Sequence, residues 1–215
     1  MIELFAENAD FYLSGFRNTL LLFAAALTLS VALGTVMAAF RVWGPALVSG
    51  LATIYVEFFR STPLLIQLIF YGTFLAQAGL VRSPMQAGII GLSIYTGAFV
   101  TEVVRSGILS VDARQLETAR SLGLTQVQAL RHVVMPQAVR TVIPPLGNVA
   151  IALAKNTTLV GAALAAEDLL KVGQIVESRT FDPNALTIVV LGYLAITLPL
   201  AWTVGRLERR MAFAR

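Results

Sequence analysis

Long apolar runs make up most of the chain, and short polar stretches separate them. A helix needs about 20 apolar residues to cross the hydrocarbon core of a bilayer. Runs of that size cover approximately Leu13–Phe40, Thr62–Leu80, Gln86–Leu109, Thr141–Ala163 and Leu186–Val204. The pattern predicts an all-α, polytopic membrane protein with about five transmembrane helices.

A shorter apolar stretch, Leu47–Phe59, precedes the second run. Because it contains Glu57 and is followed by Arg60, we interpret it as an interfacial helix that turns into a span. Thr62 would then cap that span, and Pro63 would lie in its first turn, where a missing N–H does no harm. The alternative is that Pro63 kinks one very long helix.

Small residues follow a regular spacing in the first run. Ala26, Ser30, Gly34 and Ala38 recur every four residues and so share one helical face. Such a face lets helices pack closely in a membrane. The third run contains irregularly spaced glycines, which we expect to relieve crowding in the most buried helix: Gly88, Gly91, Gly97 and Gly107.

Composition supports a membrane location and narrows the chemistry. The chain is 57% hydrophobic and 13% charged, well outside the range of soluble domains. It has no cysteine and one histidine, His132, which excludes a disulfide framework, a thiolate metal site and a histidine metal cluster. No linker or charge block divides the chain, so residues 1–215 are expected to form a single domain.

Basic residues predict the orientation. With an external N-terminus, one side of the membrane carries Arg41, Arg60, Arg105, Arg114, Arg120, Arg131, Arg140, Arg206, Arg209, Arg210 and Arg215. The other side carries Arg82, Lys171, Arg179 and Arg17. The positive-inside rule makes the first side cytoplasmic, and the acidic N-terminal residues Glu3, Glu7 and Asp10 suit the external side.

The N-terminal sequence lacks the pattern of a removable signal peptide, so we expect the first run to remain as an anchor. The high isoelectric point is explained by the arginines that set the orientation, and no nucleic-acid partner is implied.

A polar hairpin interrupts the apolar pattern between the third and fourth runs. Asp112 and Gln115 have the spacing of a helix N-cap and its reciprocal partner, and Thr125 and Gln128 repeat it. Gly123 lies between them, where a helix needs a left-handed end. The hairpin is therefore predicted to be a stiff cytoplasmic protrusion of two short helices.

This hairpin has the features of a docking surface. Ala119 and Gly123 are four residues apart and would remove side-chain bulk from one face, while Glu117 offers a charge for an arginine or a backbone amide. Pro136 follows and would bend the chain. The alternative is an ordinary solvated helix in which Glu117 has no role.

Charges within the apolar runs are the remaining candidates for function, since each is costly there unless it is paired or hydrated. Glu102 and Arg105 are three residues apart and are expected to form a structural ion pair, with a gating role as the alternative. Lys155, Asn156, Thr157 and Thr158 place an ammonium, an amide and two hydroxyls in succession. They could bind a substrate carboxylate at a broken helix; alternatively, Lys155 extends to the interface and its neighbours fill a kink.

Enzyme signatures are absent from the sequence. There is no phosphate-binding GxxxxGK[ST], no HExxH and no nucleophile elbow. We expect no catalytic residue, metal site or cofactor in this chain, and any ATP hydrolysis would need a partner subunit.

The hairpin resembles the EAA signature of ABC importer permeases. That signature is EAA, three residues, G, nine residues, I, one residue, LP, and the spacing here matches throughout. The matching residues are Glu117-Thr118-Ala119, Gly123 and Val133-Val134-Met135-Pro136. The departures from the signature are Thr118, Val133 and Met135, and they leave the docking role intact.

Other segments resemble the polar amino-acid permeases of the histidine/glutamine/glutamate type over nearly the whole chain. The matching segments are Gly15 to Leu20, Tyr55 to Leu65 with Gln67, Tyr95 to Phe99 with Glu102, Arg105 and Gly107, and Lys155 to Leu159.

The resemblance implies a type I importer at the bacterial inner membrane that moves polar amino acids by alternating access. It implies a cytoplasmic ATPase dimer, a second permease subunit that is identical or related, and an external solute-binding protein. The hairpin would be the coupling helix in a groove of the ATPase. A stand-alone transporter and a scaffolding membrane protein remain as alternatives, and copurification of an ATPase separates them.

Overall fold

Helices account for all the regular structure in residues 1–212, the part that the computed structural model describes. This confirms the all-α prediction. In chain order they are α1 Ile2–Glu7, α2 Ala9–Trp43, α3 Ala46–Ser61, α4 Leu64–Gln77, α5 Pro84–Leu109, α6 Ala113–Ser121, α7 Gln126–Ala129, the π-helical segment η1 Leu130–Val134, α8 Met135–Asn156, α9 Thr158–Leu164, α10 Leu169–Thr180 and α11 Asn184–Ala212.

Three helices, α2, α5 and α11, are each long and apolar enough to cross a membrane. Two further spans exist only if bent pairs are counted as one: α3 with α4, which meet at 108°, and the run Gln126–Leu164 with α10, which meet at 51°. The predicted span Thr62–Leu80 is therefore shorter than expected, because α4 has 14 residues. At about 1.5 Å per residue it reaches about 21 Å, less than a hydrocarbon core of about 30 Å.

Pro63 lies between the separate helices α3 and α4, so the two-helix interpretation is confirmed and the alternative of one long kinked helix is wrong. Thr62 is not the cap of α4: Pro63 takes that position without a side-chain hydrogen bond. Gln67 instead holds the bend, since its buried Nε2 lies 3.1 Å from the Phe59 and Thr62 carbonyl oxygens and 2.6 Å from Thr62 Oγ1. A side chain in the next helix thus satisfies the backbone that the break exposes.

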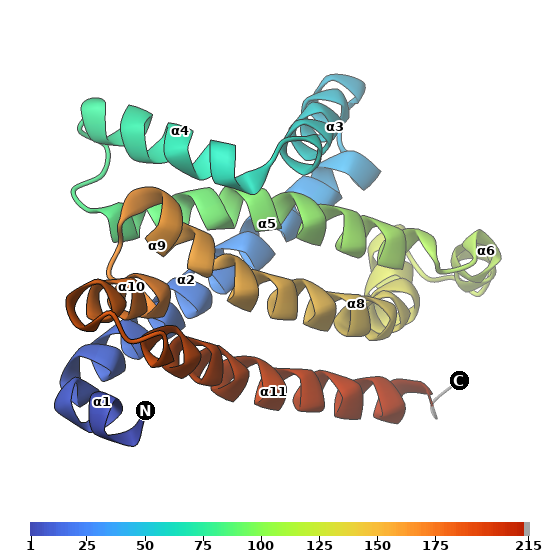
Figure 1. Cartoon of the computed structure of the whole chain (residues 1–215). Coiled ribbons are helices and arrows are strands. Elements are labelled where there is room, and N and C mark those ends of the chain that lie inside the picture. The colour runs from blue at the N-terminus through green and yellow to red at the C-terminus, as the bar shows by residue number, and fades with distance from the viewer. Residues whose placement is uncertain (213–215) are drawn as a thin grey trace.

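The centre of the molecule is the packing of α2 along α5 (Figure 1). The four small residues of α2 are all buried, as predicted: Ala26, Ser30, Gly34 and Ala38. At Gly34 the two helices approach so closely that an added Cβ would lie 2.8 Å from the Gly97 carbonyl oxygen of α5.

The glycines of α5 also fulfil their prediction. This helix has neighbours on several sides, and each glycine faces a side chain from another helix: Gly88 faces Val160, Gly91 faces Leu68, Gly97 faces Tyr55 and Gly107 faces Val142. A larger side chain at any of these four glycine positions would push away α3, α4, α8 or α9. The glycines therefore allow α5 to serve as the central helix.

The elements separate into two ends (Figure 1). At one end lie α6 and the C-terminal end of α11, which carry Arg114 and Arg120, and Arg206, Arg209 and Arg210, respectively. At the other end lie the N-terminus and α10, which carries Lys171 and Arg179. Arg215 lies outside the described residues.

Candidate functional site: an exposed hairpin and a polar helix break

Local hydrogen bonds build the hairpin from α6 and α7. Asp112 accepts a bond from the Arg114 N–H at 2.9 Å and caps α6. Gly123 has a φ of +90°, a conformation that glycine adopts without a steric penalty. Thr125 and Gln128 form a complete capping box at the start of α7. These three parts of the prediction are confirmed.

Gln115 does not act as the reciprocal partner of Asp112. Its Oε1 instead accepts a hydrogen bond from the Gln137 side chain, and Gln137 also donates to the Val133 carbonyl at 2.9 Å. This correction changes the mechanical picture, because α6 is attached directly to α8.

The π-helical segment η1 connects the hairpin to α8, and the sequence did not predict it. The Met135 N–H bonds to the Leu130 carbonyl, five residues back. Pro136 follows and has no N–H to continue the regular ladder. Pro136 thus lies in the first turn of α8, where a proline is tolerated.

The predicted hairpin residues differ in their exposure to solvent. Glu117 and Gly123 are exposed, whereas Ala119 is only 5% exposed and packs inside the hairpin. The interpretation that Ala119 presents a bare face to a partner is therefore wrong. Two apolar side chains that the sequence analysis did not select, Leu122 and Val127, are 80% and 74% exposed. Both are large apolar residues in an otherwise polar segment, and this contrast in the sequence could have identified them as exposed.

Glu102 and Arg105 contact each other on α5. The Glu102 carboxylate also accepts a bond from Arg41 at 2.7 Å, which the sequence analysis did not anticipate. Arg41 lies in the last turn of α2, so the three charges join the ends of α2 and α5. The side chains are partly buried, at 13%, 28% and 27% exposure for Arg41, Arg105 and Glu102.

The predicted element Lys155–Thr158 lies where α8 ends and α9 begins. Lys155 is exposed and Asn156 is half-buried, but Thr157 is fully buried. The hydroxyls of Thr157 and Thr158 donate to the carbonyls of Ala154 and Lys155, both at 2.8 Å. The structure therefore presents an ammonium and an amide at a helix break, with Thr157 turned into the core.

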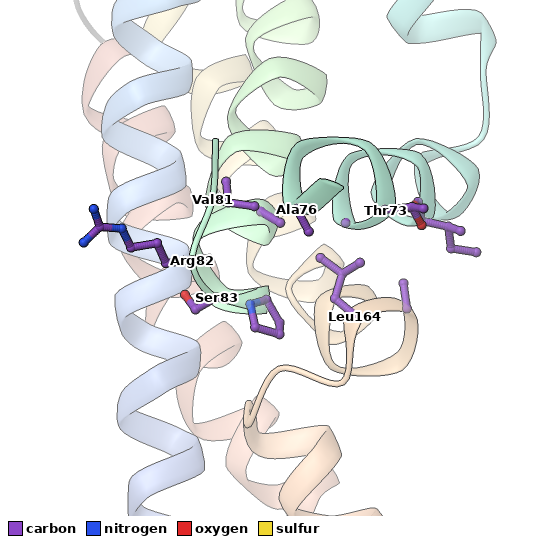
Figure 2. A pocket seen from close by; sticks show the side chains of 11 residues that line it. Thr73, Ala76, Val81, Arg82, Ser83 and Leu164 are labelled. Carbon is purple, nitrogen blue, oxygen red and sulfur yellow. The ribbon is translucent and has the colours of Figure 1, made fainter. Parts of the chain in front are cut away.

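A separate hollow of about 330 Å³ lies between α4, the start of α5 and the end of α9 (Figure 2). Its lining includes Thr73, Ala76, Val81, Ser83 and Leu164. Figure 2 shows the Arg82 side chain directed away from it. None of the predicted site residues lines this hollow.

Within residues 1–212, no three histidine, aspartate or glutamate side chains gather in a way that could hold a metal ion.

Comparison with known proteins gives consistent matches. A glutamine permease named as probable, GlnM of Bacillus subtilis, is 40% identical over 98% of this chain and 97% of its own length. The glutamate transport system permease GluC of Corynebacterium efficiens is 34% identical over 99% of both chains. The glutamine transport system permease GlnP of Escherichia coli K12 is 31% identical over 93% of this chain and 92% of its own.

Solved structures match as well. An amino acid ABC transporter crystallised with histidines has a chain that is 33% identical, with a TM-score of 0.87 over 95% of this chain and 96% of that one. A chain of the inward-facing MetNI methionine ABC transporter is 19% identical, with a TM-score of 0.78 over 94% and 97%, a likeness that concerns the fold alone. The fold is that of type I ABC importer transmembrane domains.

The family model for the inner membrane component of binding-protein-dependent transport systems matches residues 30–213. Most of the chain falls within that match, including the hairpin, the ion pairs and the polar helix break. The chain therefore belongs to the family of binding-protein-dependent transport system inner membrane components.

Proposed function

We propose that this chain forms the translocation pathway of an ATP-driven importer for polar amino acids. The observation that carries the proposal is its likeness, over nearly its full length, to permeases named for glutamine and glutamate. A cytoplasmic ATPase dimer supplies the energy, an external binding protein delivers the solute, and a second permease subunit completes the pathway.

The hairpin is the docking surface for the ATPase. Glu117 is exposed on α6, on a shallow surface that Arg120 and Ser121 also line. Leu122 and Val127 add apolar contact area at the same tip, and burying such side chains against a partner is favourable. The bond between Gln115 and Gln137 gives movement of the hairpin a direct route to α8.

Within the element Lys155–Thr158, Lys155 and Asn156 contact the solute, and Thr157 and Thr158 shape the helix end that presents them. Lys155 is exposed at the end of α8, and a cation near an apolar span can pair with the carboxylate that all amino acids carry. Asn156 offers a donor and an acceptor next to it. Because the α-carboxylate is common to every amino acid, this element recognises the class and not the individual side chain.

The N-terminus lies outside the membrane and the hairpin and C-terminus lie in the cytoplasm. The support is the excess of arginine at the end that carries α6 and the end of α11.

Reconstitution of the purified complex tests the proposal. The tagged chain is expected to copurify with an ATPase, and liposomes containing the complex, with the binding protein outside and ATP inside, are expected to accumulate labelled glutamine or glutamate. Omitting ATP is the matched control. Equal uptake by the isolated chain without ATPase would instead establish a stand-alone transporter, and failure to bind any ATPase would refute the importer assignment.

A further inference from the structure

A fully buried carboxylate lies at the turn between α9 and α10, and the proposed pathway does not use it. This carboxylate belongs to Asp168, whose side chain is 0% exposed. Its Oδ1 accepts a hydrogen bond from the Lys171 N–H at 2.8 Å and so caps α10. The carboxylate also lies against the backbone of Gly161 in α9, where an added Cβ would be 1.9 Å from Oδ1. One side chain therefore caps the start of α10 and contacts the middle of α9.

Gly161 makes this approach possible. A Cβ at position 161 would overlap Asp168 Oδ1, so any other residue would displace the carboxylate or the helix. Gly161 is in α9 and Asp168 caps α10. The contact thus fixes the position of one helix relative to the next.

Two other helices supply polar groups to the same place. Thr19 of α2 accepts a hydrogen bond from the Leu169 N–H at 3.0 Å. The Tyr193 hydroxyl of α11 lies beside Asp168, Thr19 and Thr157, although no aligned hydrogen bond joins it or Asp168 Oδ2 to other described residues. Thr19, Thr157, Asp168 and Tyr193 are called the Asp168 cluster below.

The Asp168 cluster includes part of the predicted pathway element, because Thr157 belongs to both. Directly after Thr157, α9 runs for only seven residues. A helix that short has no stability of its own in the absence of tertiary contacts. Its position is set at its start by Thr157, which is a member of the cluster, and in its middle by Gly161, which contacts Asp168.

We propose that Asp168 is a positioning residue that holds α9, and with it Lys155 and Asn156, against α10, which itself packs on α2 and α11. The proposal builds on the assignment of Lys155–Thr158 to the solute pathway. Asp168 does not touch the solute: it sets the position of the groups that do.

Thiol labelling measures the position of the element directly, because the chain has no native cysteine. The reporter is Asn156→Cys, reacted with a maleimide in the reconstituted complex. It is combined with Asp168→Ala, which removes the acceptor, or with Gly161→Ala, which displaces it. We expect either change to alter the labelling rate about tenfold, equivalent to about 1.4 kcal/mol. Asp168→Asn keeps one acceptor oxygen and is expected to preserve the parental rate.

Two controls make the result specific. Gly205→Ala makes the same substitution in α11, where no atom lies within 4 Å of the added Cβ, and is expected to leave the rate unchanged. Ser110→Cys, exposed at the end of α5 and outside the docking surface, reports global loosening, and its labelling rate is expected to be the same in all backgrounds.

An unchanged Asn156→Cys rate in Gly161→Ala and Asp168→Ala overturns the proposal, as does a parallel change at Ser110→Cys. If Asp168→Ala does not assemble with the ATPase, Gly161→Ala decides by the same criterion. Normal transport by Lys155→Ala would refute the role of Lys155 in the pathway, but it would leave the labelling result and the positioning of α9 unaffected.

Discussion

Gly34 determines how closely α2 can approach α5. Its missing side chain leaves room for Val100 and for the Gly97 carbonyl. Because an overfilled interior shifts side chains and backbone, a larger residue here is expected to cost about 1–3 kcal/mol.

Gly34→Leu is therefore expected to lower the thermal unfolding temperature of the purified chain in detergent. The control is Gly50→Leu in α3, where no atom lies within 4 Å of an added Cβ. Equal unfolding temperatures for the two variants would contradict the close packing of α2 on α5.

Lys155 is the residue on which the solute pathway depends most. It is exposed at the end of α8, and its ammonium is the group proposed to pair with the solute carboxylate. Lys155→Ala is expected to abolish ATP-dependent uptake while leaving copurification with the ATPase intact.

The matched control is Lys171→Ala, which removes the other lysine of the chain, on α10. We expect this variant to take up solute at a near-normal rate. Uptake by Lys155→Ala at the rate of the control would remove Lys155 from the pathway.

At the scale of elements, the hairpin must be stiff to transmit movement. Its N-caps at Asp112 and Thr125 each stabilise one of the short helices by about 1 kcal/mol. Glu117 is exposed between them and is free to meet a partner.

Glu117→Lys is expected to weaken ATPase docking, because it reverses the charge presented to the groove, without unfolding the spans. Copurified ATPase and uptake should both fall, while the unfolding temperature of the chain stays constant. Glu7→Lys makes the same charge change in α1 at the opposite end and should have no such effect. A fully coupled complex carrying Glu117→Lys would exclude the docking role.

Patterns of residues close together in the sequence predicted the short helices and the caps of the hairpin. Contacts between residues far apart in the sequence determine the features that those patterns did not predict. The capping box at Thr125 depends on residues three apart, so the sequence alone contains it. The bond from Gln115 to Gln137 spans 22 residues, and η1 depends on how α8 packs. The inward turn of Ala119 likewise comes from packing that no local pattern encodes.

For the whole molecule, hydropathy located every apolar segment, and helix geometry decided which of them are unbroken. The first, third and fifth runs became α2, α5 and α11. The second run begins at the bend that Pro63 makes between α3 and α4, and the fourth run ends before the polar turn at Asp168, where α10 departs at 51°. Contacts from other helices satisfy the groups exposed at each break. Periodicity identifies apolar length but not the partners that stabilise a break, so the roles of Gln67 and Asp168 were not anticipated.

Single cysteines test the orientation of the whole chain. Asn8→Cys is expected to react with a membrane-impermeant maleimide added to intact cells, whereas Ser110→Cys, exposed at the end of α5, should react only after the membrane is opened. The expected difference follows from the arginine distribution, and the absence of native cysteine keeps the background low. Labelling of Ser110→Cys from outside would reverse the proposed topology.

The 14-residue length of α4 has a consequence for biosynthesis. A segment too short to cross the hydrocarbon core cannot hold a stable place in lipid when it leaves the translocon, because its polar ends would meet acyl chains. It becomes stable only after α5 emerges and packs along it. We therefore expect cotranslational insertion of this chain to proceed by delayed release, with the short helix retained at the translocon until its downstream neighbour has been synthesised.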